Sequence, residues 1–141
     1  MHLQDGLKSV KENTDWKTSS LYLIDSGSDI ETLNWLELFC EPYFCKLWQL
    51  GNVGYTVAAN FGVRRTGSAA VVLMNPDVLV CREWIRKLRK ALFTCESTAL
   101  VGPLSNAASF QSFPDVFGPD GNLYVNQLPY GMSHQDMCNL L

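Results

Sequence analysis

The sequence lacks the residue sets on which several common kinds of site depend. Its two histidines, His2 and His134, stand near opposite ends, and no two of its cysteines have the Cys-x-x-Cys spacing. A structural zinc site needs four nitrogen or sulfur ligands at compatible spacing, so none is expected. The Gly-x-x-x-x-Gly-Lys-Ser/Thr loop of nucleoside triphosphatases is also missing, as is any Ser-His-Asp or Cys-His set.

Long apolar stretches are missing as well. No run approaches the roughly 20 residues that a membrane-spanning helix needs. The N-terminus does not have the charged-then-apolar start of a secretory signal. We therefore expect a soluble, cytoplasmic protein, in which the irregularly spaced cysteines are small apolar thiols in a reducing cytosol. The cysteines are Cys40, Cys45, Cys81, Cys95 and Cys138.

The composition is that of a globular domain without a strongly charged partner. The chain has 141 residues, 47% of them hydrophobic and 18% charged, and a formal net charge of −3. This charge gives no reason to expect nucleic acid as a partner. All 11 lysines and arginines lie at or before Lys90. That asymmetry suits either a phosphate-binding part or a solvated surface, and the sequence leaves both interpretations open.

The apolar pattern alternates between helical and strand periodicity. It predicts helices at about residues 2–13, 30–40, 55–66 and 82–93, and a last helix capped by Ser133. It predicts strands at residues 21–24, 43–50, 69–74 and 98–101, with a short one near 123–125. This order is typical of a Rossmann-like α/β fold, a mostly parallel sheet with helices on both faces.

One feature of this order is unusual. The chain opens with a helix, whereas a doubly wound sheet opens with a strand, so the first strand is expected to be missing. We predict a single partial domain over residues 1–141, with its ligand-binding part at about 1–103. A loop-rich segment follows over 104–141.

Polar loops follow three of the predicted strands. Asp25 and Asp77 each stand at the end of an apolar run, where a carboxylate is costly without a partner. Asn52-Val53-Gly54 follows the strand between them. Ligands bind outside the carboxyl ends of parallel strands, so the three loops are candidates for one site. Each can instead be an ordinary turn or helix cap, with Ser28 or Asp29 as a cap, and that interpretation stays open.

Four segments together carry a resemblance to a known family. They are Ile24-Asp25-Ser26-Gly27-Ser28-Asp29, Asn52-Val53-Gly54-Tyr55 with Asn60-Phe61-Gly62, Leu73-Met74-Asn75-Pro76-Asp77-Val78, and Val101-Gly102-Pro103-Leu104-Ser105-Asn106. In this order, with Trp84 and Leu88 on a following helix, they resemble the family-2 glycosyltransferases, which have the A-type glycosyltransferase fold. The last segment is similar to bacterial members that build surface polysaccharides, such as rhamnosyltransferases.

The resemblance implies transfer of a sugar from a dTDP-, UDP- or GDP-linked donor to a glycan or lipid-linked acceptor, with inversion. It implies that Asp25 binds the nucleotide base and that Asp77 holds Mg²⁺ or Mn²⁺ against the diphosphate. The other residues implied in nucleotide binding are Ser28, Asn52, Gly54, Asn60 and Asn75. The Asn-Pro-Asp form of the metal motif favours a dTDP-linked deoxysugar.

Two parts of the family pattern are not found in the sequence. No segment matches its opening strand, and none of Asp115, Asp120 and Asp136 matches its catalytic base. The alternative is therefore a non-catalytic remnant that binds a nucleotide or a partner. A flavodoxin-like nucleotide-binding switch is a third hypothesis.

Two surface features suggest further partners. An uncovered sheet edge favours pairing with a partner or a second copy, as a homodimer. The predicted helix 82–93 is rich in basic residues, which suits either the inner face of a membrane or plain solvation. These residues are Arg82, Arg86, Lys87, Arg89 and Lys90.

Overall fold

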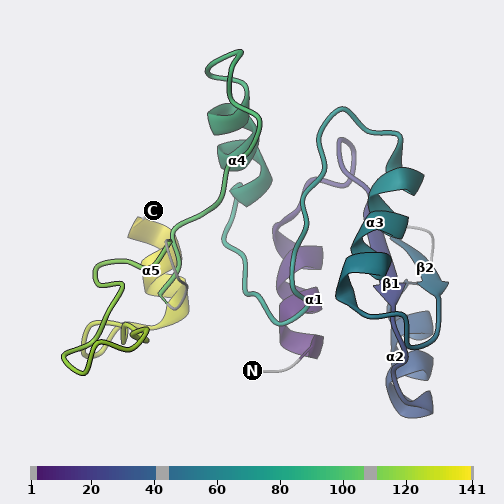
Figure 1. Cartoon of the computed structure of the whole chain (residues 1–141), viewed down its shortest axis with the longest axis horizontal. Helices are drawn as coiled ribbons and strands as arrows, with labels where there is room; N and C mark the ends of the chain where they lie inside the picture. Colours follow the sequence, from purple (N-terminus) through teal and green to yellow (C-terminus); the bar gives the residue numbers. More distant parts are fainter. Residues whose placement is uncertain (1–2, 41–44, 107–110, 141) are drawn as a thin grey trace. The chain divides into compact units, whose positions relative to one another are not determined.

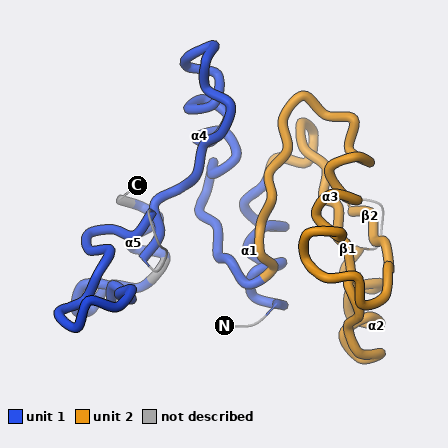
Figure 2. Tube along the Cα trace, viewed as in Figure 1, with its two compact units in different colours: residues 1–14, 77–141 blue, residues 15–76 orange. Residues whose placement is uncertain are grey.

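The computed structural model describes residues 3–40, 45–106 and 111–140. The chain forms two compact units (Figure 2). One comprises Asp15–Pro76, and the other comprises Met1–Thr14 together with Asp77–Leu141. The predicted boundary at about residue 103 separates a ligand-binding part from a loop-rich segment. It is a functional boundary and not one between compact units, and it stays a prediction.

The unit of residues 15–76 contains a parallel sheet of two strands. Strand β1 (Leu21–Asp25) pairs with β2 (Cys45–Gln49), with Leu23 opposite Leu47. Helix α2 (Ile30–Cys40) connects the strands (Figure 1), as parallel neighbours require. Helix α3 (Tyr55–Thr66) follows β2. The predicted α/β class, with parallel strands joined through helices, is confirmed.

Helices cover both faces of this sheet, as predicted. Successive side chains of a strand point to opposite faces, so Ile24 and Asp25 lie on different sides. Ile24 packs against α3, where a Cβ built on Gly62 would lie 3.1 Å from its Cγ1. Cys45 shares the face of Asp25 and is joined to Cys40 of α2 by a disulfide. The sheet therefore has α3 on one face and α2 on the other.

Aromatic contacts strengthen the α3 side. The rings of Tyr22 and Trp48 are stacked with their centroids 5.4 Å apart. Phe61 of α3 meets Trp48 edge-on at 6.1 Å, and the Arg65 guanidinium lies 4.4 Å from the centre of the Phe61 ring. Such pairs add about 0.5–1.5 kcal/mol beyond the area that they bury. They fix α3 on the sheet although only Ala58 and Gly62 of this helix are buried.

The predicted start of α2 and the predicted end of α3 are confirmed. The main-chain N–H of Thr32 donates to Oδ1 of Asp29 at 2.8 Å, so Asp29 rather than Ser28 caps α2. This hydrogen bond lowers the pKa of Asp29. Gly67 ends α3 in the left-handed conformation, with φ 58°. The predicted stop of α2 at Pro42 lies outside the described residues.

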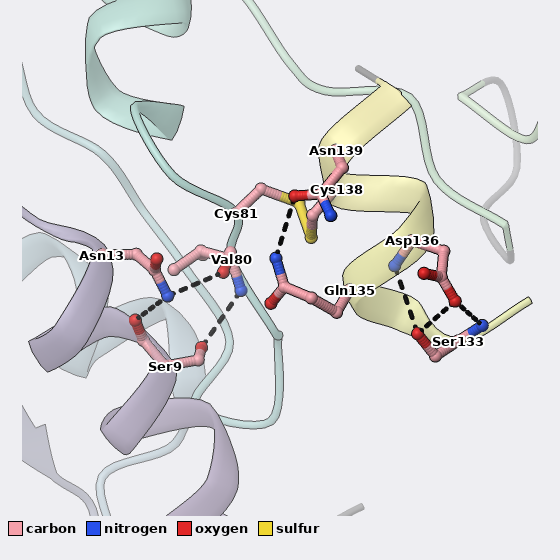
Figure 3. The surroundings of a disulfide bond; sticks show 9 residues. All are labelled: Ser9, Asn13, Val80, Cys81, Ser133, Gln135, Asp136, Cys138 and Asn139. Atoms are coloured by element: carbon pink, nitrogen blue, oxygen red, sulfur yellow. Dashed lines mark hydrogen bonds between the residues drawn. A yellow bond between two sulfur atoms is a disulfide. The ribbon is translucent and has the colours of Figure 1, made fainter.

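The other unit has a small core around helix α1 (Leu3–Asn13). Leu7 and Val10, two of the predicted apolar positions, are buried, and so is Val80. The Ser9 hydroxyl accepts a hydrogen bond from the Val80 N–H at 3.1 Å, and Asn13 Nδ2 donates to the Val80 carbonyl at 3.3 Å (Figure 3). The two polar residues of α1 thus hold the main chain of residue 80.

Helices α4 (Trp84–Leu92) and α5 (His134–Leu140) complete this unit. Trp84 Nε1 donates to Thr14 Oγ1 at 3.1 Å. Ser133 caps α5 as predicted, because its hydroxyl accepts from the Asp136 N–H while the Asp136 carboxylate accepts from Ser133 (Figure 3). A disulfide between Cys81 and Cys138 ties α5 to the segment held by α1.

Three predicted strands do not form in the described part of the chain. Residues 69–74 and 98–101 make no ladder, and residues 123–125 contribute only an isolated bridge from Leu123 to Phe117. Val71 and Leu73, central to the strongest apolar run, are 40% and 58% exposed. A strand exists only where a neighbour accepts its hydrogen bonds, and an apolar run cannot supply that neighbour by itself.

The expectation of free thiols is wrong for four of the five cysteines. Cys40 pairs with Cys45 and Cys81 with Cys138, at Cα–Cα distances of 5.1 and 5.2 Å, while Cys95 is free and exposed. Such distances are normal for disulfides. Disulfides are rare in a reducing cytosol, so these pairs weigh against the compartment that we expected, which stays a prediction. None of the helices among the described residues is long and apolar enough to cross a membrane.

Removing the Cys81–Cys138 disulfide should cost more stability than removing the other. It spans 57 residues, so its loss should lower the free energy of unfolding by about 4 kcal/mol on loop-closure entropy. The Cys40–Cys45 loop spans only 5 residues, for which the same relation predicts about 2 kcal/mol. Urea unfolding of the two double Cys→Ser variants without reductant measures both values. Equal losses would contradict the long-range pairing.

Gly62 should tolerate little added volume. Gly62→Val would place methyl groups against Ile24, which already lies 3.1 Å from the position of a Cβ. We expect a loss of about 1–3 kcal/mol from overpacking. Gly62→Ala should cost less, because Ala gains about 1 kcal/mol of helix propensity over Gly. Urea titrations of both variants test this, and a Val variant as stable as the parent would rule out the close packing of α3 on β1.

Candidate functional site

Asp25 organises the loop at the carboxyl end of β1. Asp25 is buried, with only 7% of its surface exposed. Its carboxylate accepts hydrogen bonds from the N–H of Gly27 at 3.1 Å and of Ser28 at 3.2 Å. The main-chain carbonyl of Asp25 accepts from Leu50 N–H at 3.0 Å, which continues the ladder to β2. The charge is therefore buried but hydrogen-bonded, as a carboxylate in this position must be.

These two hydrogen bonds use only part of the acceptor capacity of the Asp25 carboxylate. An ionised carboxyl group offers about four acceptor positions on its two oxygens. Two main-chain N–H groups occupy part of this capacity, and a ring N–H of a nucleotide base can use the rest. The turn-forming role of Asp25 is observed, and its base-binding role stays a prediction.

The second polar loop lies directly against the first. The Ser26 hydroxyl accepts hydrogen bonds from the N–H of Val53 at 3.2 Å and of Gly54 at 3.1 Å. A Cβ on Gly27 would lie 3.2 Å from the Cα of Asn52, a tight contact, and Gly27 has φ 99°, a conformation that favours glycine. Gly54 then begins α3 with φ 76°, a backbone conformation that also favours glycine. The structure thus brings the loops of Asp25 and of Asn52–Gly54 together at one edge.

This edge offers both acceptors and donors. α3 has no side-chain hydrogen bond at its N-cap, so its first turn presents main-chain N–H groups. The positive end of the helix dipole favours a negative ligand group near them. The carboxylate of Asp25 supplies the acceptor side. A ligand with donor atoms at one end and anionic groups at the other matches this arrangement.

Asn60 is placed differently from the other predicted ligands. It lies on α3 midway between Ala58 and Gly62, the two buried residues of that helix, and is itself exposed. With 3.6 residues per turn, a residue two positions from both points away from the sheet. A role for Asn60 at the edge formed by the two loops stays a prediction.

Asn75 and Asp77 flank Pro76 in an exposed turn. Asn75 belongs to the unit of residues 15–76, and Asp77 begins the segment of the other unit. Because Asp25 and Asp77 belong to separate units, a cavity shared by the two carboxylates stays a prediction. The turn that Asn-Pro-Asp sequences favour is present.

The described residues fit a metal ion only if the phosphates of a substrate supply further ligands. In the part of the chain that the structure describes, no group of three or more His, Cys, Asp or Glu side chains could hold an ion. Mg²⁺ is, however, commonly bound by one or two carboxylates together with substrate phosphates. The exposed Asp77 fits this phosphate-dependent mode and no other.

Two acids near the C-terminus, Asp120 and Asp136, do not have the raised pKa of a general base. The Asn122 side chain and N–H hold the pKa of Asp120 below its usual value, and Ser133 does the same for the pKa of Asp136. A base that works near neutral pH needs a raised pKa, so both shifts are in the wrong direction. The main chain of Asp115 is held by the Asn126 side chain.

Sequence reasoning missed Asn126, which organises the polar segment after residue 104. This residue is 5% exposed. Its side chain bonds to the main chain of both Asp115 and Asn106, and Asn106 Nδ2 donates to the Asn126 carbonyl at 3.2 Å. Asn106 therefore has a structural role here. A single asparagine in a polar stretch carries no sequence signal that would distinguish it from its neighbours.

Comparison with known proteins gives one match. The family model described as glycosyl transferase family 2 matches residues 2–109. The matched range includes the loops of Asp25, Asn52–Gly54 and Asn75–Asp77. No curated protein and no solved structure matches the chain.

Loss of the Asp25 carboxylate should open its loop. Asp25→Ala removes the acceptor of two main-chain N–H groups, and we expect the free energy of unfolding to fall by about 2 kcal/mol. Asp25→Asn keeps one acceptor oxygen and should lose about half of that. Asp15→Ala is the matched control, because Asp15 accepts a similar bond from Lys17 N–H at 3.0 Å but is exposed. Urea unfolding that ranks Asp15→Ala equal to Asp25→Ala would contradict the importance of burial.

Proposed function

Because the chain belongs to glycosyl transferase family 2, we propose that it binds a nucleotide-diphosphate sugar and takes part in metal-assisted, inverting transfer of the sugar. The family supports glycosyl transfer in general. Donor, acceptor, metal dependence and inversion are parts of the proposal.

One observation carries the proposal. A buried, hydrogen-bonded carboxylate stands at the carboxyl end of a parallel strand, and the Asn52–Gly54 loop is docked beside it by Ser26. In open α/β sheets this is the edge where ligands bind. The family match over the same residues supports a nucleotide sugar as that ligand.

Each residue at this edge has a role suited to its chemistry. Asp25 accepts a hydrogen bond from a ring N–H of the base, since an ionised carboxylate is only an acceptor. Ser28 and Asn52 are exposed and can reach the base or ribose. Gly54 leaves room for the ligand beside the start of α3. Asn60, which points away from the sheet, and Asn75, in the exposed turn, are not placed at this edge, and their contact with the ribose and phosphates is part of the proposal.

Asp77 would hold Mg²⁺ or Mn²⁺ together with the diphosphate. Such an ion stabilises the charge that develops on the departing nucleoside diphosphate. The metal motif of the family is nominally Asp-x-Asp, and Asn75 replaces its first carboxylate with a neutral amide, so the protein contributes a single negative charge here. Binding of the ion should therefore depend strongly on the nucleotide being present.

We assign no catalytic base. Deprotonation of an acceptor hydroxyl by a placed base contributes about 10²–10⁴ to the rate. The lowered pKa values of Asp120 and Asp136 argue against either acid in this role. Nucleotide binding is therefore the first activity to measure, before transfer.

The proposed acceptor is a glycan or a lipid-linked glycan. The five basic residues at positions 82–90 are exposed on or beside α4, and Arg86 among them pairs with Glu83 at 2.7 Å. Exposed cations suit either peripheral association with the inner face of a membrane or plain solvation, and the first is part of the proposal although the two disulfides weigh against a cytosolic location. Among donors, the Asn-Pro-Asp motif favours a dTDP-linked deoxysugar.

The alternative is a non-catalytic module that binds a nucleotide or a partner, including a second copy of the chain. Within the described residues β1 pairs only with β2, which leaves one edge of β1 open. An open edge does not distinguish this alternative from an enzyme. Measured transfer of a sugar distinguishes them, while metal dependence of nucleotide binding separates both from a flavodoxin-like, metal-independent switch.

The test is calorimetric titration of UDP, dTDP and GDP into the chain, with and without Mn²⁺. We expect Asp77→Asn to weaken binding at least about tenfold with Mn²⁺ and to have no effect without it, because it removes a charged ligand of the ion. Asp25→Asn should weaken binding about tenfold in both conditions, because it changes the acceptor for the base.

Glu96→Gln is the control, because Glu96 is an exposed acid outside the proposed site. Nucleotide binding that ignores both Mn²⁺ and Asp77→Asn would favour a metal-independent module. A parent chain that binds none of the three nucleotides would refute the proposal.

A further inference from the structure

Ser26 joins the two loops of the proposed site. Its hydroxyl oxygen accepts one hydrogen bond from Val53 N–H at 3.2 Å and another from Gly54 N–H at 3.1 Å. The donors lie 27 and 28 residues further along the chain. A serine hydroxyl has two acceptor positions, so both are used to hold this one loop.

The geometry on either side of Ser26 depends on that attachment. Gly27 approaches Asn52 so closely that a Cβ would lie 3.2 Å from three of its atoms. On the other side, Leu50 N–H donates to the Asp25 carbonyl at 3.0 Å as the last bond of the ladder. Beyond Leu50 the loop leaves the sheet, and it remains beside Asp25 only if something holds it.

The loop has little internal support of its own. A main-chain hydrogen bond runs from Val53 N–H to the Gly51 carbonyl at 2.9 Å, within the loop itself. Residues 51–54 are all exposed, and Gly51 and Gly54 have positive φ values of 67° and 76°. Glycines with such freedom lose much conformational entropy on ordering. The Ser26 hydroxyl opposes that cost.

We propose that Ser26 is a positioning residue, which holds Asn52 and Gly54 beside Asp25 so that a nucleotide meets both loops already ordered. This inference rests on the proposed function. When a binding-competent state is only partly populated, the apparent affinity falls by that fraction. Ser26 therefore acts on nucleotide affinity through the population of the docked loop.

Few side chains at position 26 can accept the hydrogen bonds that hold the 51–54 loop. Alanine offers no acceptor, so Gly54 N–H would turn to water, Val53 N–H would keep only the Gly51 carbonyl of its own loop, and the loop would undock. Threonine keeps the hydroxyl and adds one methyl group to a half-exposed residue, so it should restore the attachment. Ser68 is an exposed serine in the same unit and outside both loops, which makes Ser68→Ala the matched control.

The experiment combines amide hydrogen exchange with calorimetric titration of UDP, dTDP and GDP in Mn²⁺ on the full chain. In Ser26→Ala we expect faster exchange at Val53 and Gly54 and about tenfold weaker nucleotide binding, from the loss of two hydrogen bonds. In Ser26→Thr both quantities should lie within about twofold of the parent. Exchange in β1, β2 and α3 should stay at parent values in every variant.

The outcomes separate the two hypotheses. Unchanged exchange at Val53 and Gly54 in Ser26→Ala would overturn the attachment itself, whatever the nucleotide does. Faster exchange with unchanged affinity would leave Ser26 a purely structural residue and overturn its positioning role. Failure of the parent to bind any nucleotide would instead refute the proposed function, and the role of Ser26 in binding with it.

Discussion

The arrangement of this edge of the molecule depends on how a buried carboxylate is satisfied. Asp25 ends a strand at 7% exposure, where a charge without partners would cost several kcal/mol. The next residues of the chain supply the N–H groups that it needs, and this requires the tight turn through Gly27. That turn places the Ser26 hydroxyl where it can hold the 51–54 loop. One electrostatic requirement thus shapes both loops.

The helices and the strands of this chain depend on different partners. A helix satisfies its own main chain, so α1, α2 and α3 begin and end close to where their apolar spacing and caps predict. A strand must find a neighbour, and only residues 21–25 and 45–49 do so as a ladder. The run at 69–74 has the composition of a buried strand and still presents Val71 and Leu73 to solvent. Its composition would suit a buried strand, but in the described structure residues 69–74 form no ladder with a neighbouring strand.

The unit that contains α1 is held together by a different set of interactions. Its apolar core is small, with Leu7, Val10 and Val80 buried. Polar contacts and one covalent bond supplement that core: α1 holds the main chain of Val80, and the Cys81–Cys138 disulfide ties in α5. Small cores commonly need such support. In the loop-rich segment the buried side chain of Asn126 likewise holds the main chain, through hydrogen bonds to Asn106 and Asp115.

The sequence by itself determined the helices, the parallel strand pair and the family, because spacing, caps and turn residues act over a few neighbouring positions. It also identified Asp25, Asn52 and Gly54 as residues of one edge. Only the tertiary structure decided that Ser26 joins their loops, that Asn126 is buried and that four cysteines are paired. Each of these depends on atoms that are distant in the chain and close in space, and local sequence patterns do not predict such contacts.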